Sequence, residues 1–287
     1  MKTFRLIAAM IPLVAVSFGT ASVQQRARLG ENAALRYWSA FAQMQDAAIT
    51  DQQAKELNLI FDGTTPYDDL KYKELVEKNR AALETMIRGT ALANCDWGVD
   101  EKLGSEAPVD YVRKALALGR LNVLYAFHLA INGDKDGAVR VLSAGLHFSH
   151  DVANGGTLFA TVAAKNLLAA HLRAVAFVLH MAGLSPAQRS LLRGAIAPLG
   201  SDGLDWQSNM KRELEIPHRL DSQASAALAR IIPAYVGVFN NPSSLPELQQ
   251  VIASAPQSLR EIIPNPKRVV EEKQDLTDKL QQTRALL

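Results

Sequence analysis

The sequence predicts an all-α protein, and three observations support this fold class. Ala and Leu, which lead the helix-propensity ranking, account for 81 of the 287 residues. Apolar residues recur at the three-to-four-residue spacing of amphipathic helices in nearly every segment. No segment keeps the apolar–polar alternation that is typical of a half-buried strand. The short connections between helices predict antiparallel helix hairpins packed in an α-α array, similar to tetratricopeptide-like arrays.

The N-terminal segment, residues 1–21, predicts a secretory signal peptide. Lys2 and Arg5 are followed by an uncharged, mostly apolar stretch over residues 6–19. The small residues after this stretch predict cleavage after Ala21, with cleavage after Ser22 as the alternative. A helix that spans a membrane needs about 20 apolar residues, so an uncleaved anchor is the less favoured interpretation. We therefore expect an exported protein, periplasmic or extracellular, that contacts a membrane only if this segment is retained.

One helical domain is expected over residues 27–255. Clusters of Gly, Pro, Asn and Asp punctuate it and separate the helices from one another. Ser185 and Pro186 have the residue types of an N-cap and a first helical position. The predicted helices are 31–44, 51–59, 69–92, 109–131, 135–152, 157–181, 186–197, 205–215, 220–238 and 244–254.

A proline-interrupted linker and a charged C-terminal helix are expected over residues 256–287. The helix, 267–287, carries four residues on one seam, which are Leu276, Leu280, Thr283 and Leu287. This seam covers about three heptads, which is short for a coiled coil. We expect the helix to fray or to dock on the domain, and self-association through it is the alternative.

The composition excludes several classes of protein. A hydrophobic content of 48% and a net charge of +2 exclude a disordered chain. The single cysteine, Cys95, excludes an internal disulfide. Without Lys2 and Arg5 the chain is formally neutral, so its charge gives no reason to bind nucleic acid. We expect no nucleic-acid partner and no cofactor.

Polar side chains share one face of the predicted helix 135–152, namely Arg140, Ser143, His147, His150 and Asp151. Imidazole and carboxylate groups three and four residues apart are neighbours, and metal sites use such donors. The spacing matches no known zinc motif, so a solvated polar face is favoured. A metal-binding or hydrolytic site on this face, completed by His128 or His171, is the alternative.

His171 lies on the opposite, apolar side of the predicted helix 157–181. A histidine in this position is usually a core residue with a hydrogen bond, and we favour that interpretation. A buried imidazole beside a carboxylate is also a candidate functional group. The alternative is therefore a cavity that also receives His147 or His128.

Cys95, Asp96 and Trp97 follow the long helix 69–92 and precede Gly98. We expect a structural role in which Cys95 and Trp97 fix the helix end to the core and Asp96 hydrogen-bonds the turn. The alternative is a reactive thiol, which needs a base within reach. Sequence motifs of common hydrolases and nucleotide-binding proteins are absent, so the sequence identifies no catalytic residue.

Two parts of the sequence resemble known proteins. The segment 124–152 resembles one helix hairpin of a tetratricopeptide-type repeat, and no second copy follows at a fixed period. Asn-Ala-Ala-Leu-Arg-Tyr-Trp at 32–38, followed by Cys-Asp-Trp-Gly at 95–98, resembles a family of exported helical bacterial proteins without an assigned activity. This second resemblance implies a helical architecture and supplies no catalytic residues.

The sequence thus predicts an exported helical scaffold or binding protein that takes a protein partner in a groove between helix hairpins. The alternative is a metal-binding protein or hydrolase that uses the face of His147, His150 and Asp151.

Overall fold

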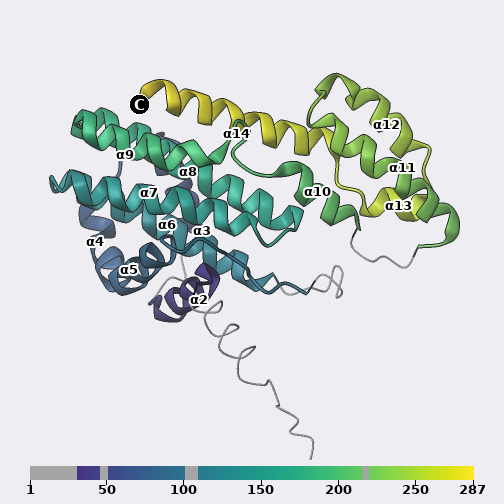
Figure 1. Cartoon of the computed structure of the whole chain (residues 1–287). Helices are drawn as coiled ribbons and strands as arrows, with labels where there is room; N and C mark the ends of the chain where they lie inside the picture. Colours follow the sequence, from purple (N-terminus) through teal and green to yellow (C-terminus); the bar gives the residue numbers. More distant parts are fainter. Residues whose placement is uncertain (1–30, 46–50, 101–108, 216–219) are drawn as a thin grey trace, which may run out of the picture.

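The structure is a computed structural model that describes residues 31–45, 51–100, 109–215 and 220–287. The all-α fold class is confirmed. Across these ranges the chain forms helices and their connections, and the only β pairing is an isolated bridge between Asn32 and Asn94. Figure 1 shows the helices stacked in layers, with residues 222–262 grouped at one end of the molecule. The predicted signal segment, 1–21, lies outside the described residues.

Three long helices form the centre of the molecule: α6 (Asp110–Ile131), α7 (Lys135–Ala153) and α8 (Leu158–Ala182). Each of them packs on the other two, so all three share one core (Figure 1). The turn between α6 and α7 uses Gly133 with a φ of 84°, a conformation that other residues rarely adopt. Asp134 then caps α7, because its side chain accepts a hydrogen bond from the Gly137 N–H.

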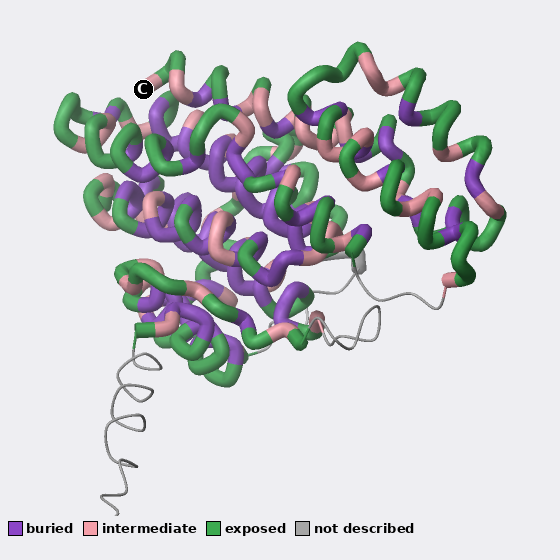
Figure 2. The backbone as a smooth tube through the Cα atoms, turned by 45° about the vertical axis from the view of Figure 1, so that its right-hand side comes forward, coloured by how far each residue is buried: buried purple, intermediate pink, exposed green. Residues whose placement is uncertain are grey.

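The helix α8 is long and apolar enough to cross a membrane by length and composition alone. However, 72% of the most apolar 18-residue stretch of α8 is buried inside the protein. Figure 2 shows the same concentration of buried residues along the central helices. Its position in the core accounts for its composition, because a helix covered on most sides is apolar on most sides.

Four shorter helices precede the central three: α2 (Ala33–Gln43), α3 (Asp51–Phe61), α4 (Asp69–Lys78) and α5 (Arg80–Gly89). The single helix predicted over residues 69–92 is wrong, because the chain breaks at Asn79. The fully buried Asn79 side chain donates to the carbonyl oxygens of Gln45 and Leu75, at 2.8 and 2.9 Å. It also accepts from the Gln45 N–H at 2.8 Å. The break therefore anchors the segment that follows α2.

The C-terminal part continues with α9 (Pro186–Ile196), α10 (Trp206–Glu215), α11 (Ser222–Val238), α12 (Leu245–Ala253), α13 (Gln257–Ile262) and α14 (Pro266–Leu286). The predicted start of α9 is confirmed, with Ser185 as N-cap, Pro186 in the first turn and a capping box to Gln188. The short helix α13 lies inside the expected linker and was not predicted.

The last helix, α14, docks on the body rather than fraying. It packs along α8, and Leu276, Leu280 and Thr283 of the predicted seam are buried. Lys165 on α8 forms ion pairs of 2.6 Å with both Glu272 and Asp275 of α14. Burial of one leucine side chain contributes roughly 1.5–3 kcal/mol, so the seam supplies most of this attachment.

Candidate functional site

The two sequence segments that carry the family resemblance meet in space. The Asn32 side chain caps α2 by accepting from the Ala34 N–H at 3.1 Å. The same side chain accepts from the Asp96 N–H at 2.9 Å and donates to the Asp96 carbonyl oxygen at 2.8 Å. One asparagine therefore starts a helix and holds a loop that lies 64 residues away in sequence.

An aromatic cluster continues this contact toward α7. The Trp97 ring stacks on Tyr111 with a centroid distance of 4.2 Å, and on Tyr37 at 5.6 Å. Trp97 Nε1 donates to the Asp151 carbonyl oxygen at 2.7 Å, and the Tyr37 hydroxyl donates to Asp151 Oδ2 at 2.5 Å. The cluster thus ties the loop after α5, the helix α2 and the end of α7 together, as expected for a structural role of Trp97.

The chemistry of Cys95 fits the same structural role. Burial, together with the neighbouring Asp151 and Asp96 carboxylates, raises the pKa of the Cys95 thiol well above its usual range. A thiol with a raised pKa stays protonated at neutral pH and is a poor nucleophile. Burial likewise raises the pKa of Asp151, although the hydrogen bond from Tyr37 and the nearby His150 and His147 act in the opposite direction.

The side chains of the predicted polar face of α7 lie in different surroundings. Asp151 turns toward Tyr37 and the aromatic cluster. Arg140 pairs with Glu84 on α5 through two hydrogen bonds of 2.7 and 3.0 Å, whereas His147 is exposed and His150 is half-buried. Among the described residues, no group of three or more His, Cys, Asp or Glu side chains is arranged to hold a metal ion.

His171 lies in the core, between α6, α7 and α8, as favoured from the sequence. It is fully buried, and burial lowers its pKa to about 4. Its Nδ1 lies 2.9 Å from the Leu167 carbonyl oxygen and 3.0 Å from Ser149 Oγ, and its Nε2 lies 3.0 Å from Asn122 Oδ1. A Cβ at Gly145 would lie only 2.2 Å from the ring, so this glycine makes room for the imidazole.

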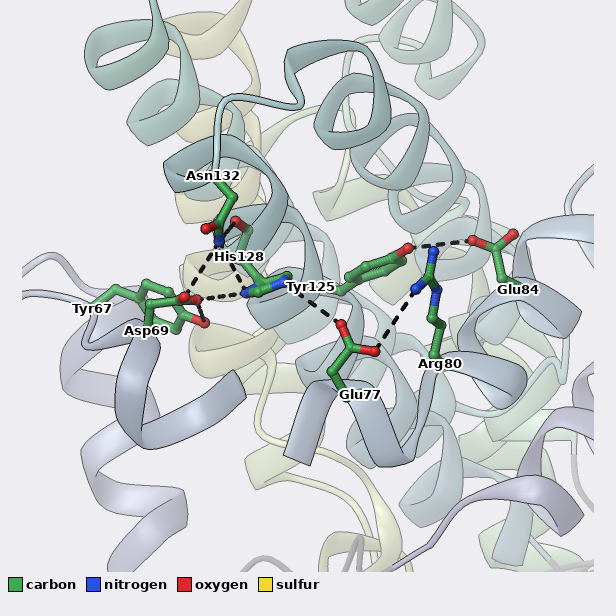
Figure 3. Close-up of polar contacts among 8 residues, drawn as sticks. All are labelled: Tyr67, Asp69, Glu77, Arg80, Glu84, Tyr125, His128 and Asn132. Carbon is green, nitrogen blue, oxygen red and sulfur yellow. Dashed lines mark hydrogen bonds and ion pairs between the residues drawn. The ribbon is translucent and has the colours of Figure 1, made fainter. Parts of the chain in front are cut away.

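His128 belongs to a separate polar cluster on the α4 side of α6, which the sequence did not indicate (Figure 3). Its Nδ1 lies 2.7 Å from Asp69 Oδ1, and the Tyr67 hydroxyl donates to the same carboxylate oxygen at 3.1 Å. Burial raises the pKa of Asp69, but the hydrogen bonds from His128, Asn132 and Tyr67 outweigh this effect and lower it overall. The pair resembles an oriented acid–base couple, but neither residue lines the apolar groove beside α7.

This solvent-open groove, of about 540 Å³, lies between α5, α7 and α9. α7 packs on both flanking helices, and Figure 1 shows α5 and α9 on opposite sides of it. The lining is mostly apolar and includes Ile87, Val139 and Leu191. Arg140 and His147 of the predicted polar face also line the groove, so the sequence located part of it.

Each wall of the groove is held by a polar pair. Arg140 and Glu84 join α7 to α5, and Gln188 Nε2 of α9 donates to Asp136 Oδ1 of α7 at 2.7 Å. These pairs bridge the helices at the surface, and the packing of α7 on α5 and α9 holds their spacing. A surface held in place before binding loses less conformational entropy when a ligand docks.

Small residues give the groove its depth, namely Ser143, Ala144, Gly194 and Ala195. A Cβ built on Gly194 meets nothing within 4 Å, so the space in front of this helical glycine is empty. Leu191, one turn earlier on α9, is 64% exposed. Leu191 therefore continues the apolar lining of the groove at its exposed rim.

Comparison of the chain with protein-family models, with curated proteins and with solved structures gave no match. The resemblance to exported helical proteins and to a tetratricopeptide-type hairpin therefore stays a prediction.

Proposed function

We propose that this protein is an exported helical binding protein that captures an amphipathic helix of a partner protein in the groove between α5, α7 and α9. The observation that carries the proposal is an apolar groove whose two walls are bridged by Arg140–Glu84 and Gln188–Asp136. Helices dock in such grooves through apolar side chains spaced three and four residues apart.

The residues of the groove favour a helix over a flat protein surface. The small side chains of Ala144, Gly194 and Ala195 leave room for large apolar anchors of a partner. Arg140 is paired with Glu84, so Asp136 is the one formally charged lining residue without an ion pair in the described part of the chain, and we expect the groove to select mainly by shape and apolarity. The alternative metal-binding or hydrolytic function has less support, because the Asp151 carboxylate is bonded to Tyr37 in the aromatic cluster.

A pair of glycine variants tests the proposal. Gly194→Leu places a side chain in the empty groove without a steric clash, and Gly237→Leu is a matched change on α11, where a Cβ also meets nothing within 4 Å. Both substitutions replace glycine within a helix, so neither variant should lose stability. Unchanged melting temperatures for the two variants confirm that the fold is intact.

The assay is affinity purification of tagged protein from its own envelope fraction after mild cross-linking. We expect one stoichiometric partner with the wild type and Gly237→Leu, and its loss with Gly194→Leu. A partner retained by Gly194→Leu, or no partner above background with the wild type, contradicts the proposal.

Export is tested separately by the mass of the protein recovered from the cell envelope. The sequence predicts a chain that begins after Ala21. Recovery of a chain that still carries residues 1–21 would contradict a cleaved signal peptide.

A further inference from the structure

A second cavity, of about 400 Å³, lies where α3, α6, α8 and α14 meet. Lys165, Ala169 and Arg173 follow one another at four-residue intervals on α8, and all three line it. The small Ala169 between two long cationic side chains leaves the space open. Leu116 and Arg120, also four residues apart, line it from α6.

Two of the three cations in this cavity have carboxylate partners. Arg173 pairs with Asp62 at 3.0 Å, and Lys165 pairs with Glu272 and Asp275 at 2.6 Å. Arg120 differs, because it has no hydrogen bond or ion pair in the part of the chain that the structure describes. It is half-buried, and burial lowers the pKa of its guanidinium.

A second hydrogen-bond donor in the cavity also lacks an acceptor among the described residues. The buried Nε of Arg173 has no hydrogen-bond partner among the described residues, although its Nη2 binds Asp62. A half-buried guanidinium without a partner and a buried N–H without an acceptor are both costly to the fold. An anion that accepts from both groups would remove these costs.

The surroundings limit the kind of anion. Asp62 and Asp275 also line the cavity, and their negative charges disfavour a dianion such as phosphate. Phe61, Leu116 and Leu167 supply apolar surface beside the cations. Guanidinium groups bind a carboxylate through two parallel hydrogen bonds, so this combination fits a monocarboxylate with an apolar body.

We propose that this cavity is a binding site for a small organic monocarboxylate, whose carboxylate pairs with Arg120 and whose apolar part lies against Phe61, Leu116 and Leu167. The site shares no residue with the groove between α5, α7 and α9. Failure of one proposal would therefore leave the other unaffected.

The experiment measures binding of four probes to the purified mature protein by calorimetry and by thermal shift. The probes are hexanoate, benzoate, hexanol and inorganic phosphate. We expect the two carboxylates to bind and to raise the melting temperature. We expect neither the neutral alcohol nor phosphate to do so.

Variants of α6 locate the site. Arg120→Gln should weaken carboxylate binding about 10-fold or more, because it removes the charged donors. The carboxylate affinity of Arg120→Lys should lie between those of the wild type and Arg120→Gln, since lysine keeps the charge and loses the planar pair of donors. Arg113→Gln is the matched control, because Arg113 lies on the exposed side of the same helix. Gly194→Leu should leave carboxylate binding unchanged.

Three outcomes would overturn the proposal. The first is that no carboxylate binds to the wild type. The second is that hexanol or phosphate binds as tightly as hexanoate. The third is that Arg120→Gln, folded by its circular dichroism and melting curve, binds hexanoate as the wild type does.

Discussion

Asn32 and Asp96 form a reciprocal pair in which one side chain satisfies both backbone groups of the other residue, at 2.9 and 2.8 Å. Because the Asn32 side chain also caps α2, a single residue couples the start of the folded body to the loop that carries Trp97. The resulting junction positions α2 and α5 against the central helices, and α5 forms one wall of the groove.

Substitution of Asn32 tests this coupling. Asn32→Ala should lower the free energy of unfolding by about 1–2 kcal/mol, because a helix cap and two further hydrogen bonds are lost. Asn32→Asp should recover only part of this loss, because its Oδ1 keeps the cap but its second carboxylate oxygen replaces the donor and is repelled by the Asp96 carbonyl oxygen. Urea unfolding measures both values, and equal stability of Asn32→Ala and wild type would show that the junction contributes nothing.

Asp151 contacts Tyr37 and Trp97 beside this junction, and its carboxyl group makes the free energy of unfolding depend on pH. Burial raises its pKa, so the folded state binds this proton more tightly than the unfolded state. The contribution of Asp151 to stability is therefore largest at low pH. It declines as pH rises from the ordinary value of about 3.9 through the raised pKa of the folded state.

Asp151→Asn removes this titration while keeping an acceptor for Tyr37. We expect the stability of the variant relative to the wild type to increase with pH across that window. The measurement is urea unfolding of both proteins from pH 4 to pH 8. A difference that does not change with pH would contradict the raised pKa, and a difference that falls would reverse its sign.

His171 has the opposite dependence at acidic pH. Its folded-state pKa of about 4 lies below the ordinary value of about 6.5, so the unfolded state binds its proton first. Stability is therefore lost as pH falls from 6.5 to 4, by up to about 3 kcal/mol. An NMR titration in which the His171 signal stays that of a neutral ring down to pH 5 confirms this, and protonation of His171 near pH 6.5 contradicts it.

The attachment of α14 predicts a contrast between two leucines. Leu280 is fully buried against the body, whereas Leu286 is 52% exposed at the end of the same helix. Leu280→Ala should destabilise the protein by about 2–5 kcal/mol, and Leu286→Ala should change stability by less than about 0.5 kcal/mol. Similar melting temperatures for the two variants would mean that α14 does not dock on α8.

The sequence predicts helices well where their signals are local. The start of α9 follows from Ser185 and Pro186, and the core position of His171 follows from the apolar face of α8. The break at Asn79 does not, because it depends on a side chain that binds Gln45, 34 residues away. Helical periodicity carries no record of such a contact.

The candidate sites show the same difference between local patterns, which the sequence reveals, and long-range contacts, which it does not. His147 and Arg140 are recognisable as one face of a helix, but the ion pair between Arg140 and Glu84 joins residues 56 positions apart. Arg120 is one arginine among many in the sequence, and only the packing of α3, α6, α8 and α14 reveals that it lacks a partner in the described part of the chain. Sites defined by what surrounds a residue, rather than by its spacing, need the fold.

The most direct test of partner binding in the groove is photo-cross-linking from its exposed rim. A photoreactive amino acid with an aliphatic side chain replaces Leu191, which lines the groove and is 64% exposed, or Gln250 on the exposed surface of α12 as the control position. We predict one major adduct from position 191, none from position 250, and loss of the adduct when Gly194→Leu is added. Adducts that are the same from both positions, or that persist with Gly194→Leu, would contradict a partner in the groove.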